Sequence, residues 1–376
     1  MNIVLCCDGT ANEFAEDRTN VVKLFSVLDH RQQKAYYHPG LGTMEPPGAL
    51  TTVTRAATRL LGKAIGYGLE ADVRDAYVFI MRHYQPGDAL YMFGFSRGAY
   101  TVRAVAALLH RYGLLRPGNE PLVPYAIRLL VSSNPDKGFA RAEELAASFK
   151  ADMGCVTCEP AFVGVWDTVS SVGWIENPLK LPYVSDNPSI HVGRHAISID
   201  ERRAFFRNHL WRSSPHLTTH GPRDVKQVWF PGVHCDVGGG YPEKESGLAK
   251  LALEWMMCEA MQAGLILDVP RAVQVLGYAG SPLTPSNPRA ARHESLTGAW
   301  YLAELLWKRH YNWARKRWGR RMNLGRRRTI PKDALVHESA YQRGAAYKKL
   351  LPPTATIELT CDFFRRAALT GSEGGE

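Results

Sequence analysis

Residues 89–109 constrain the fold of this chain more than any other segment. The apolar run Ala89–Phe95 leads straight into the pattern Gly94-Phe-Ser96-Arg-Gly98, and a helical pattern follows it. A serine at such a strand-to-helix turn projects its hydroxyl above a sheet, beside the free N–H groups at the helix start. The two glycines allow the strand and the helix to approach closely. The segment predicts a nucleophilic Ser96 at the carboxyl end of a strand. The alternative is a glycine-rich turn that only packs a helix on a sheet.

Strand and helix patterns alternate through the first two-thirds of the chain. Strand-like apolar runs stand at 2–7, 35–37, 89–95, 161–166 and 225–230. Helical patterns stand at 20–28, 69–84, 97–109, 191–207 and 245–263. This alternation is typical of a parallel sheet with helices on both faces. We therefore predict an α/β fold, α/β-hydrolase-like, with a mostly parallel sheet flanked by helices.

The alternation fades near residue 270, which suggests how the chain divides. We expect an α/β-hydrolase core at 1–270 with loop or lid insertions at 43–66 and 176–224, both of which begin with turn-forming residues. Residues 271–376 are expected to form a helical, basic extension packed on the core. A disordered tail is expected from about residue 367.

Length and composition indicate a globular protein with one large core. The 376 residues are 45% hydrophobic and 22% charged, which is ordinary for a folded domain. No apolar run approaches the length of a membrane span. The start of the chain lacks the basic residues and long apolar stretch of a secretory signal. We expect a cytoplasmic protein, and export by a route without a signal peptide stays open.

The cysteines favour reduced thiols. Their number is odd and most of them stand in apolar segments, which fits a reducing compartment. The only Cys-x-x-Cys pair lacks the second pair that a zinc site needs, so we expect no metal and no cofactor. The seven cysteines are Cys6, Cys7, Cys155, Cys158, Cys235, Cys258 and Cys361.

Two residues downstream of Ser96 stand where a serine hydrolase needs its acid and its base. Such enzymes carry them in the order Ser, Asp or Glu, His, each after a strand. Asp167 directly follows the apolar run 161–166, and His234 lies just past the run 225–230. A serine hydroxyl is a weak nucleophile, so His234 would take its proton, while Asp167 would orient and stabilise the imidazole. We therefore predict a catalytic triad.

The anion formed during such a reaction needs preorganised N–H donors. The N–H of Arg97 is one candidate because it follows the serine. The second should come from Gly9 or Thr10, in the loop after the first strand. We expect Asp8, in the same loop, to shape the loop rather than to transfer protons.

Each proposed partner of the serine also has a structural alternative. Asp167 could merely cap a helix, and His234 could bind a phosphate or a metal, or satisfy backbone groups. Asp236 competes for the role of the acid and could instead brace the glycine-rich loop around it. We expect structural or exposed positions for the other histidines, among them His191, His195, His209 and His293.

Six motifs, taken together and in order, resemble a known family. They are Cys7-Asp8-Gly9-Thr10, Thr19-Asn20-Val21-Val22, Gly94-Phe-Ser96-Arg97-Gly98-Ala-Tyr, Gly164-Val-Trp-Asp167-Thr-Val, Ile199-Asp-Glu-Arg202 and Gly232-Val-His234-Cys-Asp236-Val-Gly-Gly-Gly-Tyr241. Residues 2–265 resemble the α/β-hydrolase domain of type VI secretion phospholipase effectors, catalogued as a domain of unknown function. The resemblance implies a bacterial protein, a triad of Ser96, Asp167 and His234, and an esterase acting on lipid acyl chains. The chain departs from the toxic effectors, which usually carry additional membrane-facing regions.

The positive charge of the chain is concentrated near its end. The net charge is +10, and Lys308–Arg328 alone holds ten Lys or Arg residues and no acid. Trp300, Trp307, Trp313 and Trp318 interleave with these charges, and we expect a basic, Trp-rich helix over 302–318. Trp beside Lys and Arg is typical of an interfacial helix on an anionic membrane. The alternatives are a solvated helix with its Trp residues on the core, or a site for nucleic acid or an acidic protein. Nucleic acid is disfavoured because no recognised binding motif is present.

Three functions follow from these features. The leading one is a serine hydrolase that cleaves carboxylic esters through an acyl-enzyme, acting on phospholipid or another lipid ester. The second is a non-catalytic module that binds anionic membrane or nucleic acid through the basic Trp-rich helix. The third is an esterase of small soluble esters. The sequence does not identify a protein partner.

Overall fold

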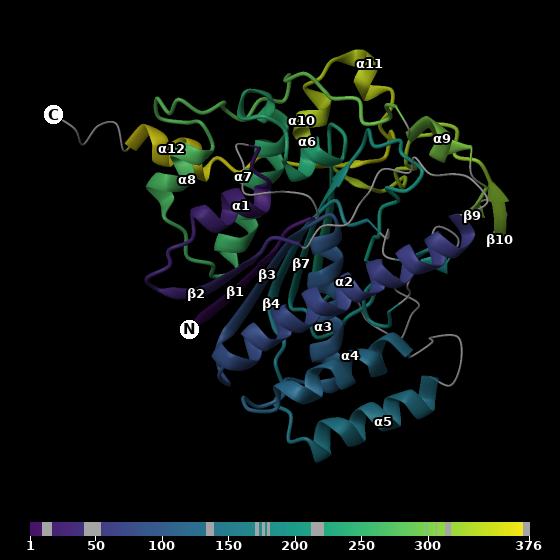
Figure 1. Ribbon diagram of the computed structural model, residues 1–376. Helices are drawn as coiled ribbons and strands as arrows, with labels where there is room; N and C mark the ends of the chain where they lie inside the picture. The colour runs from purple at the N-terminus through teal and green to yellow at the C-terminus, as the bar shows by residue number, and fades with distance from the viewer. Residues whose placement is uncertain are drawn as a thin grey trace.

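The computed structural model describes residues 1–9, 17–40, 54–132, 139–169, 173–174, 177–178, 181–211, 222–298, 300–305, 307–312 and 317–370. At its centre lies an eight-stranded sheet in the order β12-β11-β8-β7-β4-β3-β1-β2, in which every adjacent pair is parallel (Figure 1). Its strands are β1 (Asn2–Cys7), β2 (Gln33–His38), β3 (Ala89–Phe95), β4 (Pro160–Trp166), β7 (Val192–Ser198), β8 (Asp224–Phe230), β11 (Leu335–His337) and β12 (Thr356–Glu358).

Helices cover both faces of this sheet (Figure 1). One layer contains α2 (Thr54–His83), α3 (Arg97–Tyr112), α4 (Val123–Ser132) and α5 (Phe139–Asp152). The opposite layer contains α1 (Asn20–Ser26), α7 (Gly247–Gln262), α8 (Val269–Val275) and α12 (Phe363–Thr370). Among the described residues, no helix has the length and apolar content needed to span a lipid bilayer.

The remaining elements are short. The helices are α6 (His234–Gly238), α9 (Trp300–Glu304), α10 (Glu338–Tyr341), α11 (Ala345–Lys348) and the 3-10 turns Glu120–Leu122 and Glu243–Glu245. Two antiparallel pairs of strands lie outside the main sheet: β5 (Gly173–Trp174) with β6 (Asn177–Pro178), and β9 (Lys308–Asn312) with β10 (Arg317–Arg321).

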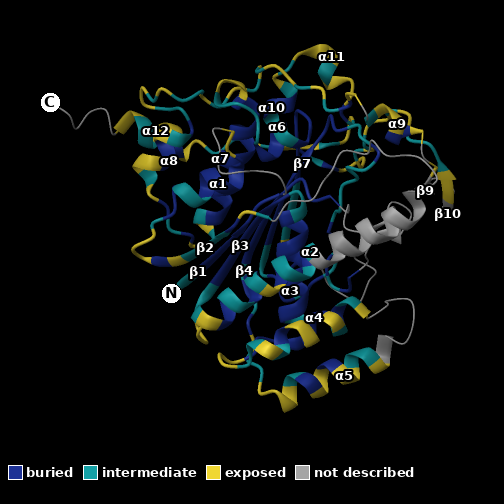
Figure 2. Cartoon of the chain, in the orientation of Figure 1, coloured by how far each residue is buried: buried dark blue, intermediate teal, exposed yellow. Residues whose placement is uncertain are grey.

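Two apolar clusters hold the layers together, one on each face of the sheet. In β1, Ile3 and Leu5 belong to the cluster under α2 and α3, whereas Val4 and Cys6 belong to the one under α1 and α7. Strands covered on both faces are apolar at every position rather than at alternate ones. Figure 2 shows the sheet as the deepest buried part of the molecule. Each fully buried aliphatic side chain contributes roughly 1.5–3 kcal/mol.

The strand order reverses between β1 and β3, because β2 lies on one side of β1 and all later strands lie on the other. In open parallel sheets, ligands bind outside the carboxyl ends of the strands at such a reversal. Asp8 follows β1 and Ser96 follows β3, so both residues lie at this point. The predicted α/β class, with a mostly parallel sheet flanked by helices, is confirmed.

The structure corrects two expectations about the core. The segment expected to be a helix at 191–207 contains β7, which lies in the sheet between β4 and β8, so the proposed insertion at 176–224 includes a central strand. The charge that obscured this strand is neutralised, because Arg194 binds Glu259 and Asp224 at 2.5 and 2.7 Å. The expected loop at 43–66 is helical from Thr54 onward, and its first part lies outside the described residues.

The expectation of a helix over 302–318 is also wrong. Helix α9 ends at Glu304, and the chain then forms the β9–β10 hairpin. Like charges four residues apart destabilise a helix, and all charged residues from Lys308 to Arg321 are basic. The aromatic residues of this segment favour strands. The extension is therefore mixed rather than helical, and it adds β11 and β12 to the sheet. Helix α12 runs to Thr370, so the expected disorder does not begin at 367; residues 371–376 lie outside the described part.

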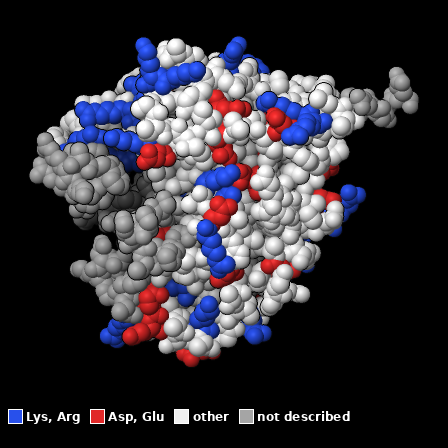
Figure 3. All heavy atoms as spheres, turned by 180° about the vertical axis from the view of Figure 1, so that it is seen from behind, with Lys and Arg blue, Asp and Glu red and all other residues white. Residues whose placement is uncertain are grey.

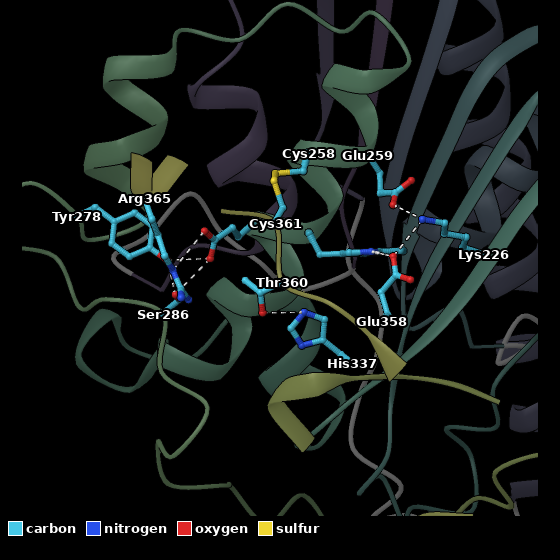
Figure 4. The surroundings of a disulfide bond; sticks show 12 residues. Lys226, Cys258, Glu259, Tyr278, Ser286, His337, Glu358, Thr360, Cys361 and Arg365 are labelled. Carbon is cyan, nitrogen blue, oxygen red and sulfur yellow. Dashed lines mark hydrogen bonds and ion pairs between the residues drawn. A yellow bond between two sulfur atoms is a disulfide. The ribbon is translucent and has the colours of Figure 1, made fainter. Parts of the chain in front are cut away.

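A disulfide joins Cys258 of α7 to Cys361, 103 residues later in the chain. It fastens the segment between β12 and α12 to the core, and Lys226 lies nearby between Glu259 and Glu358 (Figure 4). The prediction of reduced thiols is therefore wrong for this pair. No local pattern in the sequence reveals which cysteines pair. The other five cysteines are free thiols.

Candidate active site

Ser96 occupies the sharp turn that the sequence predicts. It lies between β3 and α3 with φ 57° and ψ −115°, a left-handed conformation that costs a non-glycine residue about 1–3 kcal/mol. Its N–H donates to the carbonyl of Trp166 at 3.1 Å, at the end of the neighbouring strand β4. Ser96 is partly exposed. The turn therefore leaves its side chain at the carboxyl edge of the sheet.

The flanking glycines are required by the close approach of backbone segments. A Cβ at Gly98 would lie 2.2 Å from the carbonyl oxygen of Cys7, and one at Gly94 would lie 2.5 Å from that of Gly98. A Cβ at Gly9 would lie 3.2 Å from the Cβ of Ser96. The loop after β1 therefore packs directly against the serine turn.

Asp167 and His234 meet at the same edge of the sheet. Asp167 directly follows β4, and His234 is the first residue of α6, after β8. The Nδ1–H of His234 donates to Oδ2 of Asp167 at 2.5 Å, and both side chains are buried. The other oxygen of Asp167 accepts the N–H of Ser198 at 3.0 Å. Asp167 thus orients an imidazole instead of capping a helix.

Arg328 contacts the same carboxylate, although no motif pointed to this residue. Its two terminal nitrogens lie 2.5 Å from Oδ1 and 3.0 Å from Oδ2 of Asp167. It is the last residue of the basic run, which was the only local signal. The contact spans 161 residues of sequence, so no pattern of spacing could have predicted it.

The charges of this group suit a general base. Burial alone would raise the pKa of Asp167, but the Arg328 guanidinium and the hydrogen bond from His234 outweigh it and hold that pKa well below its usual range. Burial lowers the pKa of His234 below its ordinary value of 6.5, although Asp167 opposes this shift. His234 is therefore neutral at pH 7, and with Nδ1 bonded to Asp167 its Nε2 is the nitrogen left to accept a proton.

Two aromatic rings hold the imidazole from its sides. The centroid of the His234 ring lies 4.6 Å from that of Phe95 and 4.9 Å from that of Phe206. Phe95 is the neighbour of Ser96 in the chain, so the serine turn contacts the histidine through packing. Within the described residues, no hydrogen bond joins the Ser96 hydroxyl to His234. Such contacts are often long in the absence of substrate.

The candidate anion donors differ in their availability. Arg97 is the first residue of α3, so its N–H has no partner within the helix. The N–H of Gly9 donates to Oδ1 of Asp8 at 2.7 Å, so this donor is already occupied. Thr10 lies outside the described residues.

Asp8 is buried at the end of β1 and is surrounded by donors. Its Oδ2 accepts the hydroxyls of Thr19 at 2.5 Å and of Tyr37 at 2.9 Å. These contacts join α1 and β2 to the loop after β1.

Asp236 serves a different histidine. Its Oδ1 accepts Nδ1–H of His293 at 2.6 Å, and its Oδ2 accepts the N–H of Val233 at 2.9 Å. The ring of Tyr241 stacks on His293 at 3.6 Å between centroids. Asp236 therefore braces the loop that carries His234, and Asp167 is the carboxylate that contacts the catalytic candidate.

Glu201 also contacts this site, although its place in the motif Ile199-Asp-Glu-Arg202 predicted no role for it. Its Oε2 accepts the backbone N–H of His234 at 3.2 Å, and its carboxylate also binds Arg203. Burial would raise the pKa of Glu201, but Arg203 outweighs it and the pKa falls to about 2. Glu201 therefore fixes the main chain at His234 rather than its ring. In the described ranges, no group of three His, Cys, Asp or Glu is arranged to hold a metal ion.

An apolar, basic rim adjoins this site. Trp300 of α9 contacts Phe206 at 5.5 Å between centroids, and Phe206 contacts His234. Four exposed apolar side chains follow: Tyr301, Leu302, Leu305 and Trp307. Seen from behind, Lys and Arg gather at the upper edge beside the grey residues, while both signs are interspersed lower down (Figure 3).

Comparison with known proteins gives a family and distant structural relatives. The family model for the catalytic domain of Tle1-like type VI secretion phospholipase effectors matches residues 1–259. An uncharacterized protein of Saccharomyces cerevisiae, YEL023C, is 34% identical over 232 residues, which are 57% of this chain and 33% of that protein. The chain thus spans about a third of that relative.

Two solved structures are similar at lower identity. One is the crystal structure of an uncharacterized protein from Pseudomonas aeruginosa, with TM-score 0.41 and 21% identity, covering 72% of this chain and 47% of that one. The other is the Tle1 effector bound to the VgrG spike of the type 6 secretion system, with TM-score 0.30 and 18% identity, covering 66% and 52%.

Proposed function

Because the chain belongs to the family of Tle1-like type VI secretion phospholipase effectors, with their catalytic domain at residues 1–259, we propose that it is a serine hydrolase that cleaves carboxylic esters of lipids. The observation that carries the proposal is the hydrogen bond of 2.5 Å between His234 and the buried Asp167. This pair lies at the sheet edge where Ser96 occupies its strained turn. A neutral imidazole, held by a carboxylate beside a serine turn, is the arrangement that acyl transfer needs.

The reaction proceeds in two halves. Nε2 of His234 takes the proton of the Ser96 hydroxyl while Oγ attacks the acyl carbonyl, and the oxyanion faces the N–H of Arg97. The imidazolium is stabilised by Asp167 and passes its proton to the leaving alcohol, which leaves an acyl-enzyme. Water then attacks the acyl-enzyme, gives one proton to His234, and releases the carboxylic acid as Ser96 regains that proton.

The apolar, basic rim supports a lipid substrate. Leu302 of α9, the helix that contacts the site through Trp300, is 55% exposed, and Trp307, which follows this helix, is 58% exposed. Arg320 and Arg326 are exposed on the same segment. We propose that the segment Lys308–Arg328, which contains a hairpin instead of a helix, rests on an anionic membrane surface through its exposed side chains, whereas Arg328 at its end is buried. Each basic residue near such a surface is worth about 1 kcal/mol.

A fluorophosphonate probe tests the chemistry directly. It should label the wild type and the matched control Ser132→Ala, an exposed serine at the end of α4, and fail to label Ser96→Ala. Mass spectrometry of anionic phospholipid vesicles should show free fatty acid with the first two proteins only. A folded wild type that neither takes the label nor cleaves any ester would refute the proposal.

The same experiment separates the other functions. Hydrolysis of short-chain esters without action on vesicles would favour an esterase of small soluble esters. Salt-sensitive binding to vesicles that Ser96→Ala leaves unchanged, with no turnover, would favour a non-catalytic module.

A further inference from the structure

Arg328 has more polar contacts than an ordinary surface arginine, and its side chain is only 7% exposed. One terminal nitrogen also contacts the Ser198 hydroxyl at 2.8 Å, and Nε donates to the carbonyl of Phe206 at 3.0 Å. The remaining terminal nitrogen lies 2.5 Å from that same carbonyl. The planar fork of arginine suits such a two-pronged contact with a carboxylate, and a lysine cannot reproduce it.

The chain on either side of Arg328 is anchored. On the N-terminal side, the buried carboxylate of Glu304 accepts the N–H of Gly325 and the side-chain amide of Asn323, both at 2.7 Å. The same carboxylate accepts the N–H of Ala204 at 2.6 Å, in the loop that follows β7. On the C-terminal side, β11 pairs with β8 in the main sheet. Arg328 is therefore presented to Asp167 by a braced loop.

Asp167 depends on this contact because its carboxylate is fully buried. A buried carboxylate without a counter-charge takes up a proton. A protonated Asp167 could not stabilise the imidazolium that forms on His234. The two-pronged contact also fixes the plane of the carboxylate, so that Oδ2 stays directed at Nδ1 of His234.

We infer that Arg328 is a positioning residue of this active site, supplied by a segment beyond the residues 1–259 that the family profile matches. It acts through Asp167, which it keeps ionised and correctly rotated. The inference rests on the proposed serine hydrolase and adds the regions from Glu304 to β11 to the parts needed for activity.

Steady-state hydrolysis of a fluorogenic ester by the full chain tests the inference. Arg328→Met should lower kcat about 100-fold, as small misplacements of catalytic groups do, with KM changed less than about threefold. Arg328→Lys should recover no more than about a tenth of the wild-type kcat. The control Arg128→Met removes an exposed arginine of α4 and should match the wild type.

The pH profile separates positioning from mere folding. Without Arg328, either Asp167 takes up a proton or the unbalanced charge of Asp167 raises the pKa of His234. Both move the acidic limb of kcat/KM to higher pH, by about one unit. A purely structural loss would lower the amplitude and leave the limb in place.

Two further measurements make the test decisive. Guanidinium ion should restore activity to Arg328→Ala at least several-fold, and it should restore none to Ser96→Ala. In the Asp167→Asn background, Arg328→Met should cause no further loss, because its effect passes through Asp167. A wild type that fails to hydrolyse any ester would refute the proposed function. If the wild type is active and Arg328→Met has the same kcat and the same pH profile, this inference is refuted and the proposed function stands.

Discussion

The contact at Gly98 allows one stability prediction to be worked out in sign and size. An alanine in a helix is normally about 1 kcal/mol more favourable than a glycine, so Gly98→Ala in α3 should stabilise the fold if there were space. The structure leaves none, because the new Cβ would lie 2.2 Å from the carbonyl oxygen of Cys7 and 2.6 Å from that of Asp8. Both neighbours are backbone atoms and cannot rotate away.

The cost follows from the displacement that the new methyl group demands. Ordinary contact requires α3 and the end of β1 to separate by about 1 Å, since non-bonded heavy atoms pack at ~3.5 Å. Overpacking of this kind costs ~1–3 kcal/mol or more. We take the upper end because only backbone atoms are involved. After the helix propensity is subtracted, we expect the free energy of unfolding to fall by about 2 kcal/mol.

Gly68→Ala in α2 is the matched control. No atom of the described residues lies within 4 Å of a Cβ placed there, so this variant should gain about 0.5–1 kcal/mol. Urea titrations give both values by linear extrapolation, and the two variants should differ by about 3 kcal/mol. If both variants shift the midpoint in the same direction by the same amount, the packing argument is wrong.

Three further predictions concern the site and the cross-link. Asp167→Asn should lower kcat by about 10⁴-fold, as loss of the orienting acid does in such triads, while Asp236→Asn, which leaves the Asp167 contact intact, should cost less than tenfold; equal losses would contradict the assignment. Since burial lowers the pKa of His234 below 6.5, the acidic limb of kcat/KM, where the base takes up a proton, should have its midpoint below pH 6.5. A midpoint above pH 6.5 would contradict this. Cys361→Ser should lower the free energy of unfolding by about 2–4 kcal/mol, because the disulfide closes a long loop. Thermal melts of the wild type and the variant, with and without reductant, measure this difference. If the two proteins melt alike without reductant, the thiols are already reduced in the wild type and the disulfide assignment is wrong.

The parts of the fold that the sequence predicted are those whose signal is local. Strands β1, β3 and β4 are buried along nearly their whole length and are apolar at nearly every position, so they are easily found. Strand β8 is buried and apolar only at its end, Val228–Phe230. Strand β7 was missed because Arg194 and His195 interrupt its apolar pattern. The partners that neutralise Arg194 lie on α7 and β8, and no window of sequence around the strand contains them all.

The residues of the candidate site likewise fall into those with a local sequence signal and those whose place depends on the whole fold. Ser96, Asp167 and His234 each follow a strand closely. Because the carboxyl ends of parallel strands lie at one edge of a sheet, these positions were enough to predict that the three residues lie at the same edge. Arg328 and Glu201 contact this group from loops whose positions depend on the whole fold. The disulfide partner of Cys258 was equally invisible, because pairing of cysteines cannot be deduced from their number.

The separation between Arg328 and Asp167 has a consequence for the timing of biosynthesis. The two residues are 161 positions apart, which a ribosome translates in roughly 8–30 seconds. In the later part of that interval, once His234 has been added, the nascent polypeptide contains the hydroxyl, imidazole and carboxyl groups of the proposed reaction, yet it lacks the clamp that aligns them. Premature termination would release a fragment of the same kind. If the proposed lipid hydrolysis and the role of Arg328 hold, a cell that makes this protein is thereby shielded from its unfinished copies.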